Sequence, residues 1–204
     1  MNKAINGKNS DSELFKRFSA GHEDAFRELV NRYKSGLYTF LKRLLNRHEL
    51  IEDVFQETFL QLYKSKDSFD TTRPLRPWLY TIAANKAKDL LRKERRRSTF
   101  TIGSLTEPEE SSFDDVLNTL KSFEITPYDE VNTEETAVRV RTIISKMPEN
   151  LREILIFAYF NKFSYKQMAD ILSIPVGTVK SRLHTAVNRF AKDWKAAGRS
   201  SENT

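Results

Sequence analysis

Basic side chains are concentrated in one short stretch of this 204-residue chain, where they could bind a polyanion. Between Lys86 and Arg97, seven residues are Lys or Arg and two are acidic. Basic residues near the end of a helix are partly explained by the helix dipole, which they counter. Seven such residues in one short stretch exceed that need, and clustered Lys and Arg supply the sequence-independent part of nucleic-acid affinity. The stretch therefore indicates a surface for the phosphate backbone of a nucleic acid.

A second stretch, from Ser164 to Phe190, has the residue pattern of a DNA-reading element. Ser164 followed three positions later by Gln167 is a capping box, which predicts that a helix starts there. Pro175 predicts the end of this helix, because proline disfavours a helical residue before it, and it suits the first position of a second helix. We expect that second helix to turn an apolar stripe inward, formed by Val176, Val179 and Leu183.

Two helices joined by a tight turn are typical of a helix-turn-helix, whose second helix lies in the DNA major groove. A helical hairpin with a solvated basic face fits the same pattern equally well, and short motifs carry a real risk of false matches. On this stretch alone both interpretations stay open, so the neighbouring stretches have to decide between them.

A polar loop with one aromatic residue, residues 65–74, precedes the basic stretch. Its serines, threonines, aspartates and proline are turn formers, and Phe69 is its one large apolar side chain. After Pro77, apolar residues at helical spacing predict a helix that continues through the basic stretch. Trp78 begins this helix, where it could either stack on DNA or belong to the core.

The helix predicted over residues 49–62 has one apolar and one polar face. Asp53, Gln56 and Glu57 lie on the polar face, opposite the apolar residues. Such a face is usually only a solvated surface, and the alternative is a surface that binds a partner. The apolar face is formed by Val54, Phe55, Phe59 and Leu62.

The composition excludes several classes of site. The chain contains no cysteine, so disulfides, thiolate metal sites and thiol nucleophiles are excluded. No carboxylates lie in a His-rich or Gly-rich constellation, and we therefore expect no catalytic site, metal or cofactor.

The first residues lack the apolar core of a signal peptide, and no run is long enough to span a membrane. These features predict a cytoplasmic protein without membrane insertion.

Apolar residues at helical spacing, with only six glycines and six prolines in the chain, predict an all-α protein. Residues 103–135 contain ten acidic residues and one lysine, as is typical of a solvated connector. We therefore expect two small helical domains joined by a flexible acidic linker, with the helix-turn-helix in the C-terminal one. The expected boundaries are a disordered N-terminus over 1–11, domains over 12–98 and 134–195, the linker over 99–133, and a tail over 196–204.

Two details of the helices are also expected from the pattern. Gly36 is a candidate break in the long apolar pattern of residues 25–44. Val138 heads the apolar pattern of the C-terminal domain, and we expect it to face the core together with Ile143, Ile144 and Met147.

In this order, the stretches resemble the extracytoplasmic-function sigma factors, the smallest members of the main bacterial sigma family. The family's core-polymerase-binding helix and the loop after it resemble EDVFQETFLQLYKSKDSFD. Its promoter-melting helix resembles PWLYTIAANKAKDLLRKERRR, and its fourth region resembles MPENLREILIF and FSYKQMADILSIPVGTVKSRLHTA. The resemblance extends from about Leu14 to Phe190 and favours the helix-turn-helix over the hairpin.

The resemblance implies three groups of functional residues. Core RNA polymerase would be bound, through its largest subunit, by Asp53, Gln56, Glu57 and Leu60. The minus-ten element would be melted and bound, with one flipped base held in the loop, by Phe69, Asp70, Thr71, Thr72, Trp78, Asn85, Lys86, Asp89, Arg92, Lys93 and Arg96. A flipped base needs an aromatic wall and polar groups at its edge, which this loop offers. The minus-thirty-five element would be contacted by Tyr165, Lys166, Thr178, Lys180, Ser181, Arg182, His184 and Thr185.

The implied partners are core RNA polymerase, with its largest and second-largest subunits, promoter DNA in duplex and melted form, and an anti-sigma factor.

Thr185 and Val187 stand where many relatives have arginine, and Ser173 where the turn glycine is frequent. Weaker phosphate contacts would follow, which leaves open recruitment by another DNA-bound partner. His184 fits a partly buried surface histidine equally well.

One alternative function is a helix-turn-helix regulator that binds duplex DNA independently of polymerase. It accounts for residues 135–195 but leaves residues 53–62 and 69–97 without a role. Another alternative is a nucleic-acid enzyme whose basic helix holds the substrate, and the absence of a catalytic constellation counts against it.

Overall fold

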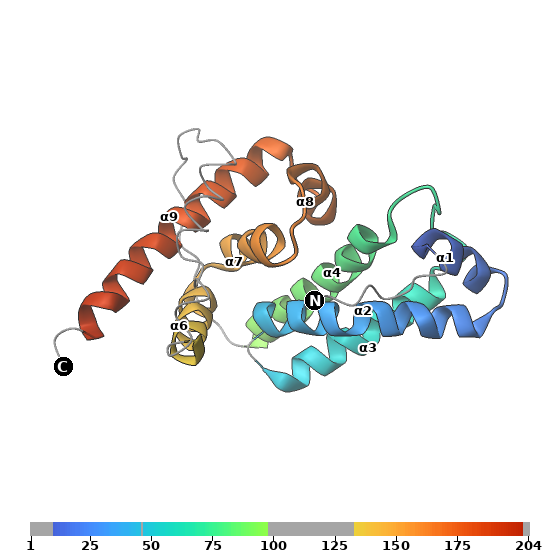
Figure 1. The fold of residues 1–204 in the computed structure, drawn as a ribbon, viewed down its shortest axis with the longest axis horizontal. Coiled ribbons are helices and arrows are strands. Elements are labelled where there is room, and N and C mark those ends of the chain that lie inside the picture. Colours follow the sequence, from blue (N-terminus) through green and yellow to red (C-terminus); the bar gives the residue numbers. More distant parts are fainter. Residues whose placement is uncertain (1–9, 46, 98–132, 202–204) are drawn as a thin grey trace. The chain divides into compact units, whose positions relative to one another are not determined.

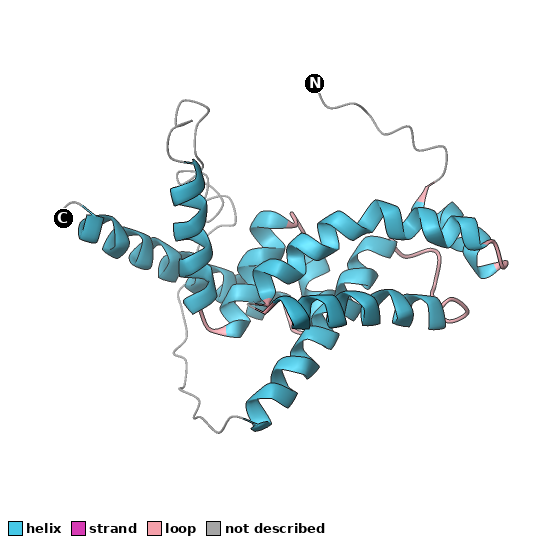
Figure 2. Ribbon diagram, turned by 90° about the horizontal axis from the view of Figure 1, so that it is seen from below, coloured by secondary structure: helices cyan, strands magenta, loops and turns pink. Residues whose placement is uncertain are grey.

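The computed structural model describes residues 10–45, 47–97 and 133–201, and all regular elements within these ranges are helices (Figure 1; Figure 2). The chain divides into two compact units, Met1–Arg97 and Ser98–Thr204. The expected all-α class is therefore confirmed. Most of the expected disordered N-terminus and nearly all of the expected linker lie outside the described residues.

Helix α2 (Glu23–Leu44) is the centre of the first unit and contacts every other described helix of that unit. It buries an apolar stripe because its apolar residues recur every three or four positions: Ala25, Leu29, Leu37, Phe40, Leu41 and Leu44. Around it lie α1 (Asp11–Ser19), α3 (His48–Lys64) and α4 (Leu75–Arg97). Helices α3 and α4 also pack on each other.

Helix α1 begins within the segment that was expected to be disordered. The Ser10 hydroxyl caps it by accepting a hydrogen bond from the Glu13 amide at 3.2 Å. The Asp11 carboxylate then accepts hydrogen bonds from the Tyr33 hydroxyl and, at 2.6 Å, from the Arg32 guanidinium of α2. Ser10 and Asp11, within the expected N-terminal segment, therefore form the cap and the first residue of an anchored helix.

Gly36 does not interrupt α2, contrary to the sequence expectation. A Cβ atom at this position would lie 3.2 Å from the Tyr80 hydroxyl of α4, which is tighter than ordinary van der Waals contact. Glycine therefore lets the tyrosine of α4 approach the backbone of α2 closely.

The second unit is built from α6 (Thr133–Lys146), α7 (Glu149–Leu155), the π-helical turn η1 (Ile156–Phe160), α8 (Tyr165–Leu172) and α9 (Val176–Ser201). Helix α9 contacts α6, α7 and α8. Pro148 precedes α7, as expected from its missing amide donor. The core of the unit includes Ile143, Ile144, Met147, Ile154, Phe157, Met168, Val179, Leu183 and Phe190.

Two apolar residues of this unit lie outside the core in which they were expected. Val138 is 51% exposed and Val176 is 41% exposed. Helix α9 starts at Val176 rather than at Pro175, so Val176 occupies the first turn of the helix. The helix also continues to Ser201, well past the expected domain end at residue 195.

Local chemistry defines both ends of α8. The capping box is confirmed: the Ser164 hydroxyl accepts from the Gln167 amide at 3.3 Å, and the Gln167 side chain accepts from the Ser164 amide at 2.9 Å. Ser173 ends the helix in the left-handed region, with a φ of 53°. A residue with a Cβ is strained there, which explains why glycine suits this turn better.

Candidate nucleic-acid interface

One face of α3 is a polar stripe that also exposes the apolar side chain of Leu60. Asp53, Gln56 and Glu57 are exposed, and Leu60 beside them is 45% exposed. The opposite face is buried, with Val54 and Phe59 in the core. An exposed leucine next to carboxylates gives a protein partner both apolar area and charge to bind.

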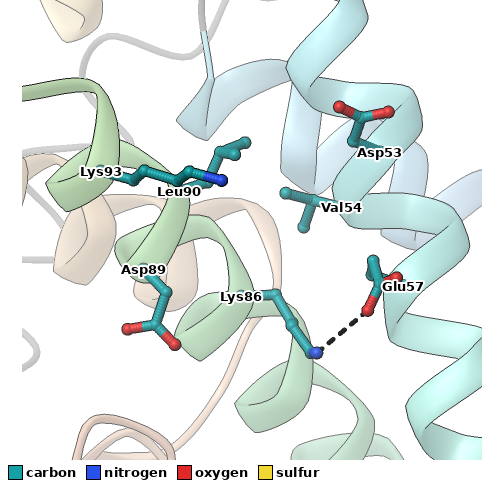
Figure 3. A pocket seen from close by; sticks show the side chains of 7 residues that line it. All are labelled: Asp53, Val54, Glu57, Lys86, Asp89, Leu90 and Lys93. Atoms are coloured by element: carbon teal, nitrogen blue, oxygen red, sulfur yellow. Dashed lines mark hydrogen bonds and ion pairs between the residues drawn. The ribbon is translucent and has the colours of Figure 1, made fainter. Parts of the chain in front are cut away.

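A pocket lies between α3 and α4, and its walls carry charges of both signs (Figure 3). Val54 of α3 and Leu90 of α4 provide its apolar lining. The Lys86 ammonium donates to the Glu57 carboxylate at 3.1 Å across the pocket. The remaining lining residues are Asp53, Asp89 and Lys93. The acidic face of α3 and the basic face of α4 therefore adjoin and share one ion pair.

The loop of residues 65–74 consists of two successive turns with Phe69 between them. In the first turn, the Ser68 amide and hydroxyl both donate to the Ser65 carbonyl, at 3.1 and 3.0 Å. In the second, the Asp70 carboxylate accepts from the Thr72 hydroxyl at 2.7 Å and from the Thr72 amide at 3.0 Å. Asp70 and Thr72 are exposed, and Thr71 is half-buried.

These hydrogen bonds lower the pKa of the Asp70 carboxyl, the Thr72 hydroxyl contributing most and the Thr72 amide next. A lowered folded-state pKa means that the second turn keeps its full stability above the ordinary carboxyl pKa. That contribution is lost as the pH falls through the lowered value. The loop therefore presents an ionised Asp70 at neutral pH.

The aromatic residues of this region form one cluster. The Phe69 ring is stacked on Trp78, with ring centroids 4.2 Å apart and planes 23° apart. The buried Phe15 of α1 meets Phe69 edge-on at 4.7 Å and Trp78 at 5.9 Å. Phe69 and Trp78 are both half-buried. The sequence left Trp78 open between DNA and core, and the structure places it in an intramolecular stack at the loop.

The outer face of α4 carries the other residues of the expected minus-ten group. Asn85, Asp89, Arg92 and Lys93 are exposed, and Arg92 lies 3.6 Å from the Asp89 carboxylate. Arg96 belongs to the same helix, but its side chain lies outside the described residues. The described part of this face is therefore open to a ligand.

In the second unit, α8 and the start of α9 carry the expected minus-thirty-five group. Lys166 and Lys180 are exposed, and the Lys180 ammonium lies 5.9 Å from the centroid of the half-buried Tyr165 ring. The other residues of the group, Thr178, Ser181, Arg182, His184 and Thr185, are half-buried.

The hydroxyl and imidazole groups in the first half of α9 contact other residues of the same helix. Ser181 donates to the Thr178 carbonyl at 3.2 Å, and Thr185 donates to the Ser181 carbonyl at 3.0 Å. One ring nitrogen of His184, Nε2, lies 3.1 Å from the Asn188 amide nitrogen. The placement of His184 fits the partly buried histidine that the sequence left open.

The arrangement of the metal-binding residue types and the polarity of the helices also bear on the class of site. No group of three or more His, Cys, Asp or Glu residues in the described ranges is arranged to hold a metal ion. No helix among the described residues is both long and apolar enough to cross a membrane.

Comparison with known proteins identifies the family. Sigma-70 region 2 matches residues 29–97, and Sigma-70 region 4 matches residues 137–190. The ECF RNA polymerase sigma factor SigW of Bacillus subtilis is 31% identical over 185 residues, covering 88% of this chain and 94% of its own. The chain belongs to the extracytoplasmic-function sigma factors. The ECF RNA polymerase sigma-E factor of Haemophilus influenzae is 34% identical to this sigma factor over 177 residues, covering 87% of this chain and 91% of its own.

Membership in this family gives the sigma factor its activity: it binds RNA polymerase and directs promoter-specific transcription initiation. A regulator that binds DNA independently of polymerase is not favoured, because both units match regions of sigma factors.

Solved structures share the fold of this sigma factor. CnrH, in complex with the cytosolic domain of CnrY, matches with a TM-score of 0.66 and 23% identity over 92% of this chain and 99% of its own. The sigma factor RpoE from Bartonella quintana, in complex with the anti-sigma factor NepR, matches with a TM-score of 0.62 and 23% identity over 83% of this chain and 96% of its own.

Sequence reasoning missed the contribution of α1 to this sigma factor's loop. Neither Phe15 nor the serines of α1 were expected near Phe69. A signal was present, since Ser10 followed three positions later by Glu13 has the spacing of a capping box. Phe15 and Phe18, three positions apart, then give the short helix an apolar face.

Proposed function

We propose that this sigma factor holds its promoter at two separate surfaces and opens DNA with the first unit. In this proposal, α3 binds the largest subunit of core RNA polymerase through Asp53, Gln56, Glu57 and Leu60. The exposure of all four side chains on one helix face supports this assignment.

The minus-ten element is assigned to the loop and the outer face of α4. Phe69 and Trp78 offer aromatic surface to an unstacked base, and the exposed Asp70 and Thr72 offer polar groups for its edge. Thr71 belongs to the same turn. The phosphates of the strand are assigned to the basic residues of α4, Lys86, Arg92, Lys93 and Arg96. Asn85 and Asp89 belong to the same surface, and Asn85 would lie near the pocket for the flipped base.

The minus-thirty-five element is assigned to α8 and the start of α9, where the second helix would enter the major groove. Lys180 and Arg182 are the side chains suited to a guanine edge, a contact that contributes about 1–3 kcal/mol of base discrimination when well formed. Tyr165 and Lys166 would meet the backbone. Thr178, Ser181, His184 and Thr185 complete the assigned surface.

The observation that carries the proposal is the combination of three surface features around the loop of residues 65–74. A half-buried aromatic stack, exposed turn residues and an exposed basic helix face occur together within one compact unit. An ordinary duplex-binding regulator has no use for this combination, whereas a protein that captures melted DNA needs all three features.

Further parts of the proposal concern the setting in which the protein acts. Core polymerase and promoter DNA place its work in the cytoplasm, and we assign it no catalytic step of its own. An anti-sigma factor is a proposed partner, because the similar RpoE structure contains the anti-sigma factor NepR. Recruitment by another DNA-bound protein is proposed only for promoters at which the second unit binds weakly.

The test reconstitutes the full chain with core polymerase on a promoter that gives a run-off transcript. Phe69→Ala or Asn85→Ala should impair strand opening, seen as loss of permanganate reactivity in the bubble, while upstream duplex binding stays largely intact. Lys180→Ala combined with Arg182→Ala should do the reverse. Equal loss of both activities in both sets of variants would contradict the division between the units, and failure to associate with core would contradict the polymerase assignment.

A further inference from the structure

Helix α1 lies beside the loop of residues 65–74 and contacts it along its length (Figure 1). The match to Sigma-70 region 2 begins at residue 29, so α1 lies outside it. Near the start of α1, the Ser12 hydroxyl donates to the Thr71 carbonyl at 3.1 Å. Near its end, the Ser19 hydroxyl donates to the Lys66 carbonyl at 3.1 Å. Between them, Phe15 meets Phe69 edge-on at 4.7 Å.

The contacting residues of α1 share one helix face. Positions 12, 15 and 19 are separated by three and four residues, which places their side chains in one row. Their partners occur in the opposite order, at positions 71, 69 and 66. Helix and loop therefore run antiparallel, and α1 contacts the first turn, the second turn and the aromatic residue between them.

Helix α1 is itself fixed to the rest of the unit. Asp11 accepts hydrogen bonds from Tyr33 and Arg32 of α2. At the other end, Phe18 packs against Phe26 and Tyr63, with ring centroids 4.7 and 5.3 Å away. Because α1 is held at both ends by these contacts, its hydrogen bonds to the loop restrain the position of the loop.

We propose that α1 is the positioning element of the promoter-opening loop, and that the Ser12 and Ser19 hydroxyls hold the loop in the shape that receives the base. The inference rests on the proposed function of the loop. A loop held in advance loses less conformational freedom when it binds, so more of the contact energy remains for strand capture. Ser12 and Ser19 act through the loop backbone and need not touch DNA.

Packing alone does not explain the two serines. Phe15 and Phe18 are core residues and would fix α1 to the unit without help from the loop. The two hydroxyls instead bind carbonyl groups of the loop, so replacing them with hydrogen removes loop contacts and leaves the apolar core unchanged. The variant Ser12→Ala with Ser19→Ala is therefore a specific probe of positioning.

The first test measures amide hydrogen exchange in the free, full-length protein. In the double serine variant, the Thr72 and Arg73 amides, which are bonded within the second turn at 3.0 Å each, should exchange faster. Amides in the middle of α2 and α3 should keep their protection. Unchanged exchange in the loop would overturn the inference, because the hydroxyls would then not restrain it.

The second test measures strand opening by the holoenzyme on a promoter that yields a run-off transcript. The double variant should lower permanganate reactivity of the bubble by roughly 5-fold or more, as expected for the loss of two hydrogen bonds of typical strength. Core association and upstream duplex binding should match the wild type, a pattern that general destabilisation would not give. Ser12→Thr as a single change keeps the hydroxyl and should open the promoter like the wild type, whereas Ser12→Ala as a single change should open it less well.

Glu13→Gln is the matched control on the same helix, since Glu13 is exposed and its side chain faces away from the row of Ser12, Phe15 and Ser19. It should open the promoter normally. If Phe69→Ala impairs opening but the double serine variant opens the promoter like the wild type, α1 is not a positioning element and the loop assignment stands. If Phe69→Ala also opens normally, the proposed function of the loop fails and this inference fails with it.

Discussion

The two units hold their proposed DNA-contacting side chains in different ways before DNA binds. In the first unit, Phe69 is stacked on Trp78 and Lys86 is paired with Glu57. In the second unit, Lys180 is exposed and its ammonium only approaches the Tyr165 ring, at 5.9 Å. Binding melted DNA would replace or extend side-chain contacts of the first unit, within a loop whose backbone α1 already holds, whereas the second unit presents exposed side chains of a preformed helix to a duplex.

This difference matches the two proposed tasks. A duplex reader gains from a rigid helix that needs no rearrangement, because its target is itself regular. A strand-opening loop has to accept a base that leaves the DNA stack. The aromatic pair Phe69–Trp78 suits this task, because an incoming base can stack on it or replace one of its rings. The comparison therefore predicts that the units can be damaged separately and that each kind of damage has its own readout.

The largest expected effect comes from cavities placed in one unit at a time. Leu183 of α9 and Leu79 of α4 are both 0% exposed. Replacing either by alanine should cost about 2–5 kcal/mol of unfolding free energy. Leu183→Ala should remove amide protection from α8 and α9 and abolish minus-thirty-five binding, while α2 and α3 stay protected. Leu79→Ala should do the opposite, and loss of protection in both units from either change would break the comparison.

A smaller effect is expected from the two serine caps. Ser10 caps α1 and Ser164 caps α8 through the same kind of hydrogen bond, at 3.2 and 3.3 Å. Removing either cap should cost about 1 kcal/mol. Ser164→Ala should weaken upstream duplex binding, measured as the affinity of holoenzyme for the minus-thirty-five region. Ser10→Ala should instead impair strand opening, because α1 supports the loop, and the same defect in both variants would contradict separate roles.

The smallest effect concerns two ion pairs of similar exposure. A double-mutant cycle with Glu57→Gln and Lys86→Gln should give a coupling of about 0.2–1 kcal/mol in the free protein, decreasing with added salt. Because Lys86 is assigned to phosphate and Glu57 to polymerase, the coupling should vanish in the promoter complex. The control is Arg189–Asp193 of α9, at 3.4 Å, whose coupling should persist there. Persistence of the Glu57–Lys86 coupling would show that this pair is purely structural.

The elements of the fold were largely predictable from periodicity, because helices that bury one face carry a clear apolar repeat. The capping box at Ser164 fixed the start of α8 from two residues. Gly36 was misread because a glycine inside a helix looks like a break until the approach of the Tyr80 hydroxyl is seen. Val138, in the middle of α6, and Val176, in the first turn of α9, were misplaced because periodicity shows which residues share a helix face but not which of them a neighbouring helix covers.

The candidate site was predictable in its residue types but not in its contacts. Exposure of Asp53, Gln56 and Glu57 agrees with the polar face of their helix. The Glu57–Lys86 pair and the support of Phe69 by Phe15 join residues far apart in the chain. Periodicity within one helix carries no information about such pairs, because they depend on how helices pack against one another.

The stack of Phe69 on Trp78 also gives the protein an optical property. The chain contains two tryptophans, and Trp78 and Trp194 lie in different units. A base that enters beside Phe69 changes the surroundings of the Trp78 indole, so its fluorescence responds to the step that the loop is proposed to perform. In a Trp194→Phe variant of the free protein, the remaining indole emission would come from Trp78 alone, and binding of a single-stranded minus-ten oligonucleotide could be followed in real time without an attached dye.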